Sequence, residues 1–203
     1  MVVKITNYEF AMLQLYRNDY DASFHVRAIA KLLDTSHVTL LSYLRRLEKN
    51  KILISRRVGK NKEYSLNSDN IITRDYLIIA EKLKTIEYLE RNFLIKKISE
   101  QLLGFDLTGA IVLFGSYAKD YATETSDIDL FYLGKLSKGI LEEIKKFGKT
   151  YGKTINIKTV SLKNFKVGLR IGDALIREIV KSHIILQNSE LFVSLLWRRY
   201  VGR

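Results

Sequence analysis

Two aspartates near the middle of the chain are the residues whose spacing points most directly to chemistry. Asp127 and Asp129 alternate with the apolar residues Ile128 and Leu130. On a β-strand, residues i and i+2 project from the same face, so both carboxylates would point one way while the apolar pair is buried on the other. Adjacent carboxylates repel each other unless a cation neutralises them. The pattern therefore predicts Mg²⁺ held by the two aspartates together with ligand phosphates.

A glycine–serine pair upstream suits a phosphate-bearing ligand. The apolar run from Ala110 to Phe114 is typical of a buried strand, and Gly115 and Ser116 follow it directly. Glycine lets the backbone approach a phosphate closely. Ser116 offers a hydroxyl near the expected N-terminus of a short helix, where free N–H groups attract anions. Alone, the pair is an ordinary strand-to-helix turn, but with two acids beginning at Asp127, eleven residues after Ser116, it indicates a nucleotide site.

The two segments Gly115-Ser116-Tyr117-Ala118 and Ser126-Asp127-Ile128-Asp129-Leu130 resemble the G-S-x-A … S-D-x-D-L signature of the DNA polymerase β-like nucleotidyltransferase superfamily, especially its minimal members. The resemblance covers about residues 108 to 192. It implies an α/β domain with a mixed sheet in which Gly115, Ser116 and Ser126 contact a nucleoside triphosphate. Asp127 and Asp129 would bind the metal and serve as the catalytic pair for attack on the α-phosphate.

Two positions depart from that signature. Asp120 stands where the superfamily commonly carries glycine, and aspartate tolerates unusual backbone angles better than most residues. Active relatives usually place a third carboxylate on the next strand, expected here over 155–160, where Asn156 or Lys158 occupies the corresponding face. Asparagine cannot act as a base and lysine would repel a metal. Two functions stay open: an enzyme that transfers a nucleotidyl group, and a non-catalytic transcriptional regulator that uses the fold as a ligand sensor or dimerisation module.

Residues 1 to about 68 show the pattern of three short helices followed by a β-hairpin. Apolar spacing predicts helices over 8–16, 26–33 and 36–50, and strands over 52–58 and 63–66 around a Gly59-Lys60-Asn61-Lys62 turn. Thr35 or Ser36 would cap the third helix, whose expected inward residues are Val38, Leu41, Leu44 and Leu47. This order resembles the winged helix-turn-helix, which implies that the third helix enters the major groove of double-stranded DNA.

Positive charge is concentrated on the third helix and the hairpin. The net charge of the chain is +12, and a basic balance favours polyanionic partners. Between Arg45 and Lys62 the sequence has eight basic residues and one acid. The alternative use of such a domain is protein contact, but the charge placement favours DNA. The residues expected to contact DNA are Thr39, Ser42, Tyr43, Arg45, Arg46, Arg56, Arg57, Lys60 and Lys62.

Residues 69–103 have an apolar period near 3.5 that predicts a long connecting helix, either continuous or broken in two. Its apolar stripe predicts a homodimer, and so does the fact that winged-helix proteins often bind paired DNA half-sites as dimers. The expected organisation is a winged-helix domain over 1–68, a connecting and dimerisation helix over 69–103, and a nucleotidyltransferase-like domain over 104–203. The last domain is expected to add a helix over 137–147, a strand over 155–160, a helix over 171–180, a strand over 183–187 and a helix over 190–203. The fold class is α+β.

Composition excludes several other classes of protein. The absence of cysteine excludes disulfides, thiolate zinc sites and cysteine nucleophiles, and fits a cytoplasmic protein. There is no run of about 18 apolar residues, so no membrane span is expected. The three histidines are scattered and show no metal-ligand spacing. A third function stays open, that of an RNA- or tRNA-modifying enzyme whose winged helix holds the substrate.

Overall fold

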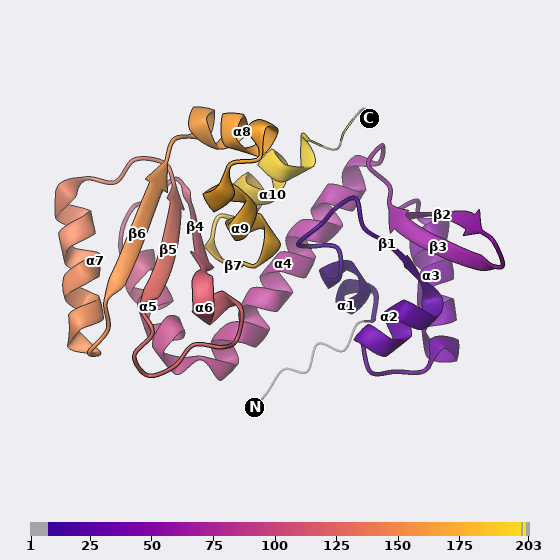
Figure 1. Ribbon diagram of the computed structural model, residues 1–203, viewed down its shortest axis with the longest axis horizontal. Coiled ribbons are helices and arrows are strands. Elements are labelled where there is room, and N and C mark those ends of the chain that lie inside the picture. Colours follow the sequence, from indigo (N-terminus) through magenta and orange to yellow (C-terminus); the bar gives the residue numbers. More distant parts are fainter. Residues whose placement is uncertain (1–7, 200, 202–203) are drawn as a thin grey trace. The chain divides into compact units, whose positions relative to one another are not determined.

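The computed structural model describes residues 8–199 and 201, and the chain forms two compact units (Figure 1). The first unit holds the described residues up to Leu83 together with those from Leu196 onward, and the second runs from Lys84 to Leu195. The boundary falls inside one helix, α4 (Ile71–Arg91). The predicted domain limits at 68 and 103 stay a prediction. None of the helices in the described part of the chain is long and apolar enough to cross a membrane.

The first unit has the predicted three helices and wing. The helices are α1 (Tyr8–Gln14), α2 (Val26–Leu32) and α3 (His37–Lys49), and the strands are β1 (Ser23–His25), β2 (Leu53–Val58) and β3 (Asn61–Leu66). The antiparallel sheet has the order β1-β3-β2. Because Val58 pairs with Asn61, the turn is shorter than predicted and consists of Gly59 and Lys60 alone. Gly59 has a φ of 60°, which favours glycine at the first position of such a turn.

Helix α3 buries a different stripe from the one predicted. Its N-cap is Ser36, whose hydroxyl accepts a hydrogen bond from the backbone N–H of Val38 at 3.1 Å. Leu40, Leu44 and Leu47 are buried at i, i+4 and i+7, whereas Val38 is 64% exposed. The prediction that Val38 faces the core was wrong, because Val38 lies about 200° around the helix from Leu40. Val38 is instead on the same outward face as Ser42 and Arg45.

The predicted connecting helix is broken in two, which was one of the alternatives left open by its length. Helix α4 ends at Arg91 and α5 (Phe93–Leu103) begins after Asn92, whose φ and ψ are −120° and 80°. The Asn92 side chain donates a hydrogen bond to the Tyr88 carbonyl at 2.9 Å. Asparagine competes in this way with the backbone bonds of a helix, which explains a break at this position.

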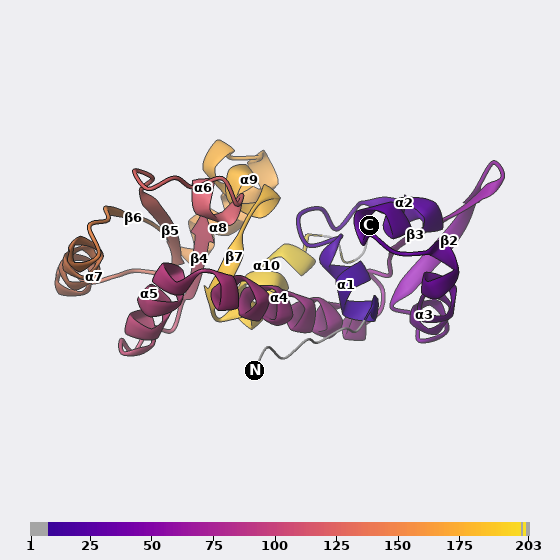
Figure 2. The ribbon, with the colours of Figure 1, turned by 90° about the horizontal axis from the view of Figure 1, so that it is seen from below.

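The second unit is built on a four-stranded mixed sheet, as predicted. Its strands are β4 (Ala110–Phe114), β5 (Ile128–Leu133), β6 (Ile155–Val160) and β7 (Ile184–Gln187), in the order β6-β5-β4-β7. Strands β5 and β6 are parallel, and the pairs β4–β5 and β4–β7 are antiparallel. The sheet lies between two layers of helices, with α8 and α9 on the opposite side from α5 (Figure 2).

Both faces of this sheet are buried by aromatic and aliphatic side chains. On one face, Leu113 and Leu130 belong to a buried cluster with Ile98 of α5 and Ile144 of α7 (Lys138–Thr150). On the other face, Phe131 packs against Phe165 of α8 (Leu162–Ile171), and Phe165 packs against Phe192 of α10 (Ser189–Trp197). The ring centroids are 5.7 Å apart in both pairs. A strand sequence buried on both sides explains the continuous apolar run from Ala110 to Phe114.

The helices after β6 differ from the prediction. A helix was expected over 171–180, but the chain forms α8 and then α9 (Ala174–Lys181), separated by Gly172 in the left-handed conformation with φ of 73°. Asp173 caps α9 by accepting a hydrogen bond from the Ile176 N–H at 3.0 Å. The predicted last helix ends at Trp197, and positions 200, 202 and 203 of that prediction lie outside the described residues.

Candidate functional site

The glycine–serine turn and the paired acids meet at one place. Phe114, the last residue of β4, is paired with Asp129 of β5, so Gly115 begins the turn directly beside the Asp129 carboxylate. A Cβ atom on residue 115 would overlap with Oδ2 of Asp129. Gly115 also has a φ of 71°, in the region that favours glycine. The structure therefore brings Gly115 and Asp129 together, and only glycine fits between the turn and the acid.

Asn156 lies between the two carboxylates. Its Nδ2 donates hydrogen bonds to Oδ2 of Asp127 and Oδ1 of Asp129, each at 3.3 Å. The cause is the register of the parallel pair, in which Asn156 of β6 is opposite Asp129 of β5. Lys158 follows two residues later and is opposite Phe131. Of the two residues considered from the sequence, Asn156 is the one that takes the place beside the acids.

The two carboxylates form a local excess of negative charge. Asp127 is exposed, Asp129 is half-buried, and neither has an ion pair with a lysine or arginine of the described residues. Among those residues, no group of three histidine, cysteine, aspartate or glutamate side chains is placed to hold a metal ion. A cation bound here would take two carboxylates from the protein and its other ligands from phosphate and water, which is the usual environment of Mg²⁺.

Two other carboxylates of this unit already have partners. Glu178 of α9 accepts a hydrogen bond from the ammonium group of Lys119 at 2.9 Å, and Asp173 caps α9. Asn156 is the residue that contacts both aspartates.

The turn after Gly115 is a single helical turn, α6 (Gly115–Ala118), and its backbone is fixed by two side chains from other elements. The Tyr88 hydroxyl donates to the Tyr117 carbonyl at 2.9 Å, and the Ser182 hydroxyl donates to the Ala118 carbonyl at 3.3 Å. Burial raises the pKa of Tyr88, so its hydroxyl keeps the proton that it donates. Because α6 has only four residues, its dipole as a helix terminus is weak. The predicted contact of Gly115 and Ser116 with phosphate stays a prediction.

The loop that leads from α6 to the acids has two features that the sequence indicated. Asp120 has a φ of 57°, a conformation that aspartate adopts more readily than most residues, which explains how it replaces the glycine of the signature. The Ser126 hydroxyl accepts a hydrogen bond from the Thr123 N–H at 2.9 Å, which closes the turn before β5. This contact gives Ser126 a role in positioning Asp127, whereas its contact with a nucleotide stays a prediction.

Two lysines near this loop were not predicted. The ammonium group of Lys153 bonds to the Glu124 carbonyl and lies 5.9 Å from the centroid of the Tyr117 ring. Lys119 lies 5.9 Å from the centroid of the Tyr121 ring in addition to its ion pair with Glu178. The sequence has no pattern that predicts these contacts, because they depend on the conformation of the loop between α6 and β5.

The residues predicted to contact DNA fall into two groups. Thr39, Ser42 and Arg45 are exposed on α3. Tyr43 is half-buried against Tyr8, with ring centroids 5.3 Å apart, so it belongs partly to the packing of α1 on α3.

Several of the predicted cations are already paired within the unit. The Arg46 guanidinium contacts Glu9, and its Cζ lies 5.3 Å from the centroid of the Tyr43 ring. Lys62 pairs with Glu48 at 2.7 Å, and Arg56 lies 3.5 Å from Glu63. The hydrogen bond from Lys62 is the main cause that lowers the pKa of Glu48. Of the cations predicted to contact DNA, three are exposed and make no ion pair with described residues, namely Arg45, Arg57 and Lys60.

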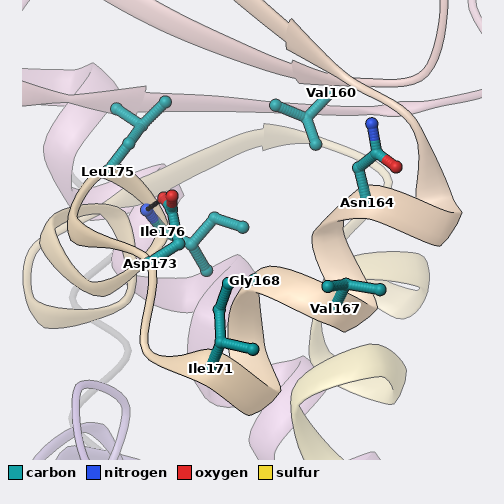
Figure 3. A pocket seen from close by; sticks show the side chains of 8 residues that line it. All are labelled: Val160, Asn164, Val167, Gly168, Ile171, Asp173, Leu175 and Ile176. Carbon is teal, nitrogen blue, oxygen red and sulfur yellow. Dashed lines mark hydrogen bonds between the residues drawn. The ribbon is translucent and has the colours of Figure 1, made fainter.

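A separate hollow of about 310 Å³ lies between α8 and α9 (Figure 3). It is lined by Val160, Asn164, Val167, Gly168, Ile171, Asp173, Leu175 and Ile176. None of the residues predicted to bind nucleotide, metal or DNA contributes to this lining.

Comparison with known proteins supports the assignment of the second unit. Residues 94–186 match the family model described as a nucleotidyltransferase domain. This span includes the turn at Gly115, both aspartates and Asn156. By its matched span, this part of the chain is similar to a nucleotidyltransferase domain.

The chain also has a weak likeness to the crystal structure of MepR, a transcription regulator of the Staphylococcus aureus multidrug efflux pump MepA. The TM-score is 0.34 and the sequence identity 20%, over 50% of this chain and 79% of that one. The winged-helix assignment of the first unit rests instead on its own helices and wing. No curated protein matches the chain.

Proposed function

We propose that the protein binds duplex DNA through α3 and the wing, and binds a nucleoside triphosphate with Mg²⁺ at the turn that begins with Gly115. The observation that carries the second part is the absence of space for any side chain between Gly115 and the Asp129 carboxylate. A phosphate that approaches the Gly115 backbone is thereby brought next to the acids. A divalent cation shared between the phosphates and the acids removes the repulsion that would otherwise oppose this approach.

Each residue of the site has a separate task in nucleotide binding. Asp127 and Asp129 would hold the cation. Once bound, the cation would neutralise the charge of the phosphates and polarise them. Ser116 would donate its hydroxyl to a phosphate oxygen. Asn156 holds the two acids in one orientation through its amide, a role that it already fills in the structure.

Asn156 also bears on whether binding leads to transfer. An attacking hydroxyl needs a group that takes its proton, and an amide does not act as a base. We therefore propose a regulator whose nucleotidyltransferase domain senses NTP–Mg²⁺, with little or no transfer. Nucleotidyl transfer is the second candidate, and it is favoured by one specific observation: the metal-binding pair and the glycine turn are both intact and adjacent.

A pair of measurements on the full chain tests this proposal. Calorimetric titration with ATP and with GTP is carried out in Mg²⁺ and again in EDTA, for the wild type and for the double variant Asp127→Asn, Asp129→Asn. We expect binding that requires Mg²⁺ and is lost in the double variant. Absence of Mg²⁺-dependent binding by the wild type would overturn the proposal.

The second measurement distinguishes the two candidates. The protein is incubated with α-labelled ATP and Mg²⁺, alone and with DNA, RNA and protein acceptors. Binding without label transfer supports the regulator. Transfer that disappears in the double aspartate variant supports the enzyme.

For the first unit, we propose double-stranded DNA over RNA because α3 exposes the short polar side chains of Thr39 and Ser42 together with Arg45. Anisotropy of labelled duplex DNA and of a structured RNA, measured over a range of salt concentrations, tests this choice. Tighter binding of the RNA would favour the RNA-modifying alternative.

A further inference from the structure

Helix α3 has an exposed aliphatic side chain at its start. Val38 is the second residue of the helix and is 64% exposed, whereas the leucines of the same helix are buried or half-buried. A β-branched residue is not favoured in a helix, and apolar methyl groups that stay in water contribute no stability by burial. Single exposed apolar residues are common on protein surfaces, so the meaning of Val38 depends on its surroundings.

Val38 lies at the end of a polar and positively charged stripe of α3. Ser42, Arg45 and Lys49 follow Val38 at steps of four, seven and eleven residues, and all three are exposed. These steps return to nearly the same angle around a helix, so the four side chains form one line opposite the buried leucines. Neither Arg45 nor Lys49 has an ion pair with a described residue. The stripe therefore fits a partner that combines negative charge with an apolar group.

Contacts within the first unit hold both ends of α3. The Ser36 hydroxyl caps the start of the helix, directly before the turn that carries Val38. Near the other end, the Glu48 carboxylate accepts hydrogen bonds from Ser55 of β2 and from Lys62 of β3. The stripe is therefore presented in a fixed orientation relative to the wing, and side chains that are already oriented lose less entropy when they bind.

We infer that Val38 packs against the 5-methyl group of a thymine in the major groove, so that the protein prefers DNA with a T·A pair at the start of α3. The major groove offers the required combination, because phosphates flank it and the thymine methyl is an apolar group on its floor. The first residues of a recognition helix are those that reach the base edges. The inference rests on the proposed binding of duplex DNA and names a base that this proposal leaves open.

The same contact discriminates against the other bases. Adenine, guanine and cytosine carry no methyl group in the major groove and present hydrogen-bond donors or acceptors there. Valine cannot bond to these groups, so a base that is desolvated against Val38 would lose its hydrogen bonds to water without replacement. Uracil differs from thymine only in the missing methyl group, which makes a direct measurement possible.

Two alternating duplexes of equal length isolate the methyl group. Every base pair of alternating dA-dT contains a thymine, so the position at which the protein binds does not matter, and alternating dA-dU lacks only the methyl groups. Anisotropy of each labelled duplex is measured with the full chain over a range of salt concentrations. We expect the wild type to bind the thymine duplex about fourfold more tightly, which is the effect of burying one methyl group.

The outcomes of this comparison separate the inference from the proposed function. Equal and salt-dependent binding of the two duplexes would overturn the role of Val38 and leave DNA binding standing. Absence of salt-dependent binding to either duplex would overturn DNA binding, and the inference with it.

The variant Val38→Ala assigns the preference to this side chain. It should bind both duplexes with the affinity that the wild type has for the uracil duplex. A preference that persists in Val38→Ala would mean that the methyl groups act through DNA shape or at another residue, and it would overturn the inference. Because alanine favours helix more than valine does, thermal unfolding of Val38→Ala should occur at or above the wild-type temperature.

The matched control is Ile171→Ala, which shortens an aliphatic side chain that is 70% exposed on α8, in the other unit. This variant should keep the wild-type preference for the thymine duplex. Loss of the preference in Ile171→Ala as well would show that the effect is not specific to α3, and the inference would be wrong.

Selection from a randomised duplex library gives an independent measurement. The wild type should enrich thymine at one fixed position of the selected sites, and Val38→Ala should lose the enrichment at that position while it keeps the others. If the two proteins enrich the same bases at every position, Val38 does not read thymine.

Discussion

The carboxylate of Asp129 occupies the space that any side chain on Gly115 would need. The two residues come from different strands, and the pairing of Phe114 with Asp129 fixes their contact. One consequence is that glycine at position 115 is required by the fold and would also serve the proposed ligand. The other is that a single methyl group at this position should move the Asp129 carboxylate away from the turn.

We expect Gly115→Ala to weaken binding of ATP–Mg²⁺ at least tenfold, about 1.4 kcal/mol, because the new methyl displaces the Asp129 carboxylate. Calorimetric titration measures the change. Gly59→Ala is the matched control, since Gly59 also has a positive φ but no atom lies within 4 Å of its added Cβ. Both variants should lose about 1 kcal/mol of folding free energy, and only Gly115→Ala should lose nucleotide affinity. Equal affinity in the wild type and Gly115→Ala would contradict the site.

The position of Asn156 predicts a gain of function. Asn156→Asp replaces the amide between the acids with a third carboxylate. Because the three carboxylates repel one another, the free energy of unfolding should fall in EDTA, and it should recover when Mg²⁺ neutralises them. We expect Mg²⁺ to raise the melting temperature of this variant by several degrees more than that of the wild type. Label transfer from ATP should appear or increase as well.

The control for this change is Asn156→Ala, which removes the amide without adding charge. It should gain neither the additional Mg²⁺ stabilisation nor transfer activity. If Asn156→Asp and Asn156→Ala behave alike in both measurements, Asn156 does not occupy the place of a metal ligand.

The distribution of ion pairs in the first unit predicts which arginines matter for DNA. Among the cations predicted to contact DNA, Arg45, Arg57 and Lys60 are exposed and make no ion pair with described residues, so each alanine variant should reduce the salt slope of duplex binding by about 1. Arg46→Ala should instead affect folding stability, because it leaves Glu9, which is 8% exposed, without this cation. Anisotropy and thermal unfolding separate the two effects. An unchanged salt slope in Arg45→Ala would remove α3 from the interface.

A pH dependence follows from Tyr16, whose hydroxyl donates to the Tyr64 carbonyl at 2.8 Å. Burial raises the pKa of Tyr16 above its ordinary value of about 10. The stabilising contribution is therefore complete below pH 10, where the unfolded tyrosine is also protonated, and is lost as the pH rises above it. Tyr16→Phe should be less stable at neutral pH by about 1 kcal/mol, yet its stability should fall less steeply above pH 10.

Denaturant unfolding at pH 7 and at pH 10.5 to 11.5 measures this difference. Tyr121→Phe, at a position that is 61% exposed, is the control and should follow the wild type. Parallel curves for the wild type and Tyr16→Phe would mean that Tyr16 does not cause the alkaline loss.

The parts of the fold that could be predicted from sequence are those determined by neighbouring residues. The apolar run before Gly115 and the alternation around Asp127 and Asp129 each define a strand locally, and the glycine–serine turn joins them. The wing was predicted for the same reason, because Gly59 lies between two strand-like runs. These local signals predicted the strands, the turn and the wing that the structure has, whereas the roles of their residues stay a prediction.

The rest depended on contacts between distant residues. Strand register decides that Asn156, and not Lys158, lies beside the acids, and register is not visible in either strand alone. The buried stripe of α3 was misplaced because four closely spaced leucines allow two helical phases, and only packing selects Leu40. The helix α8 was missed in part because its buried Gly168, which permits close packing against Ile176, is unfavourable in an isolated helix.

The most direct measurement is a crystal structure of the protein with Mn²⁺ and a non-hydrolysable ATP analogue, with the metal located by its anomalous signal. The account predicts a manganese peak that is coordinated by Asp127 and Asp129, with the triphosphate against the backbone of Gly115. A bound nucleotide elsewhere, with no metal at the two aspartates, would contradict it.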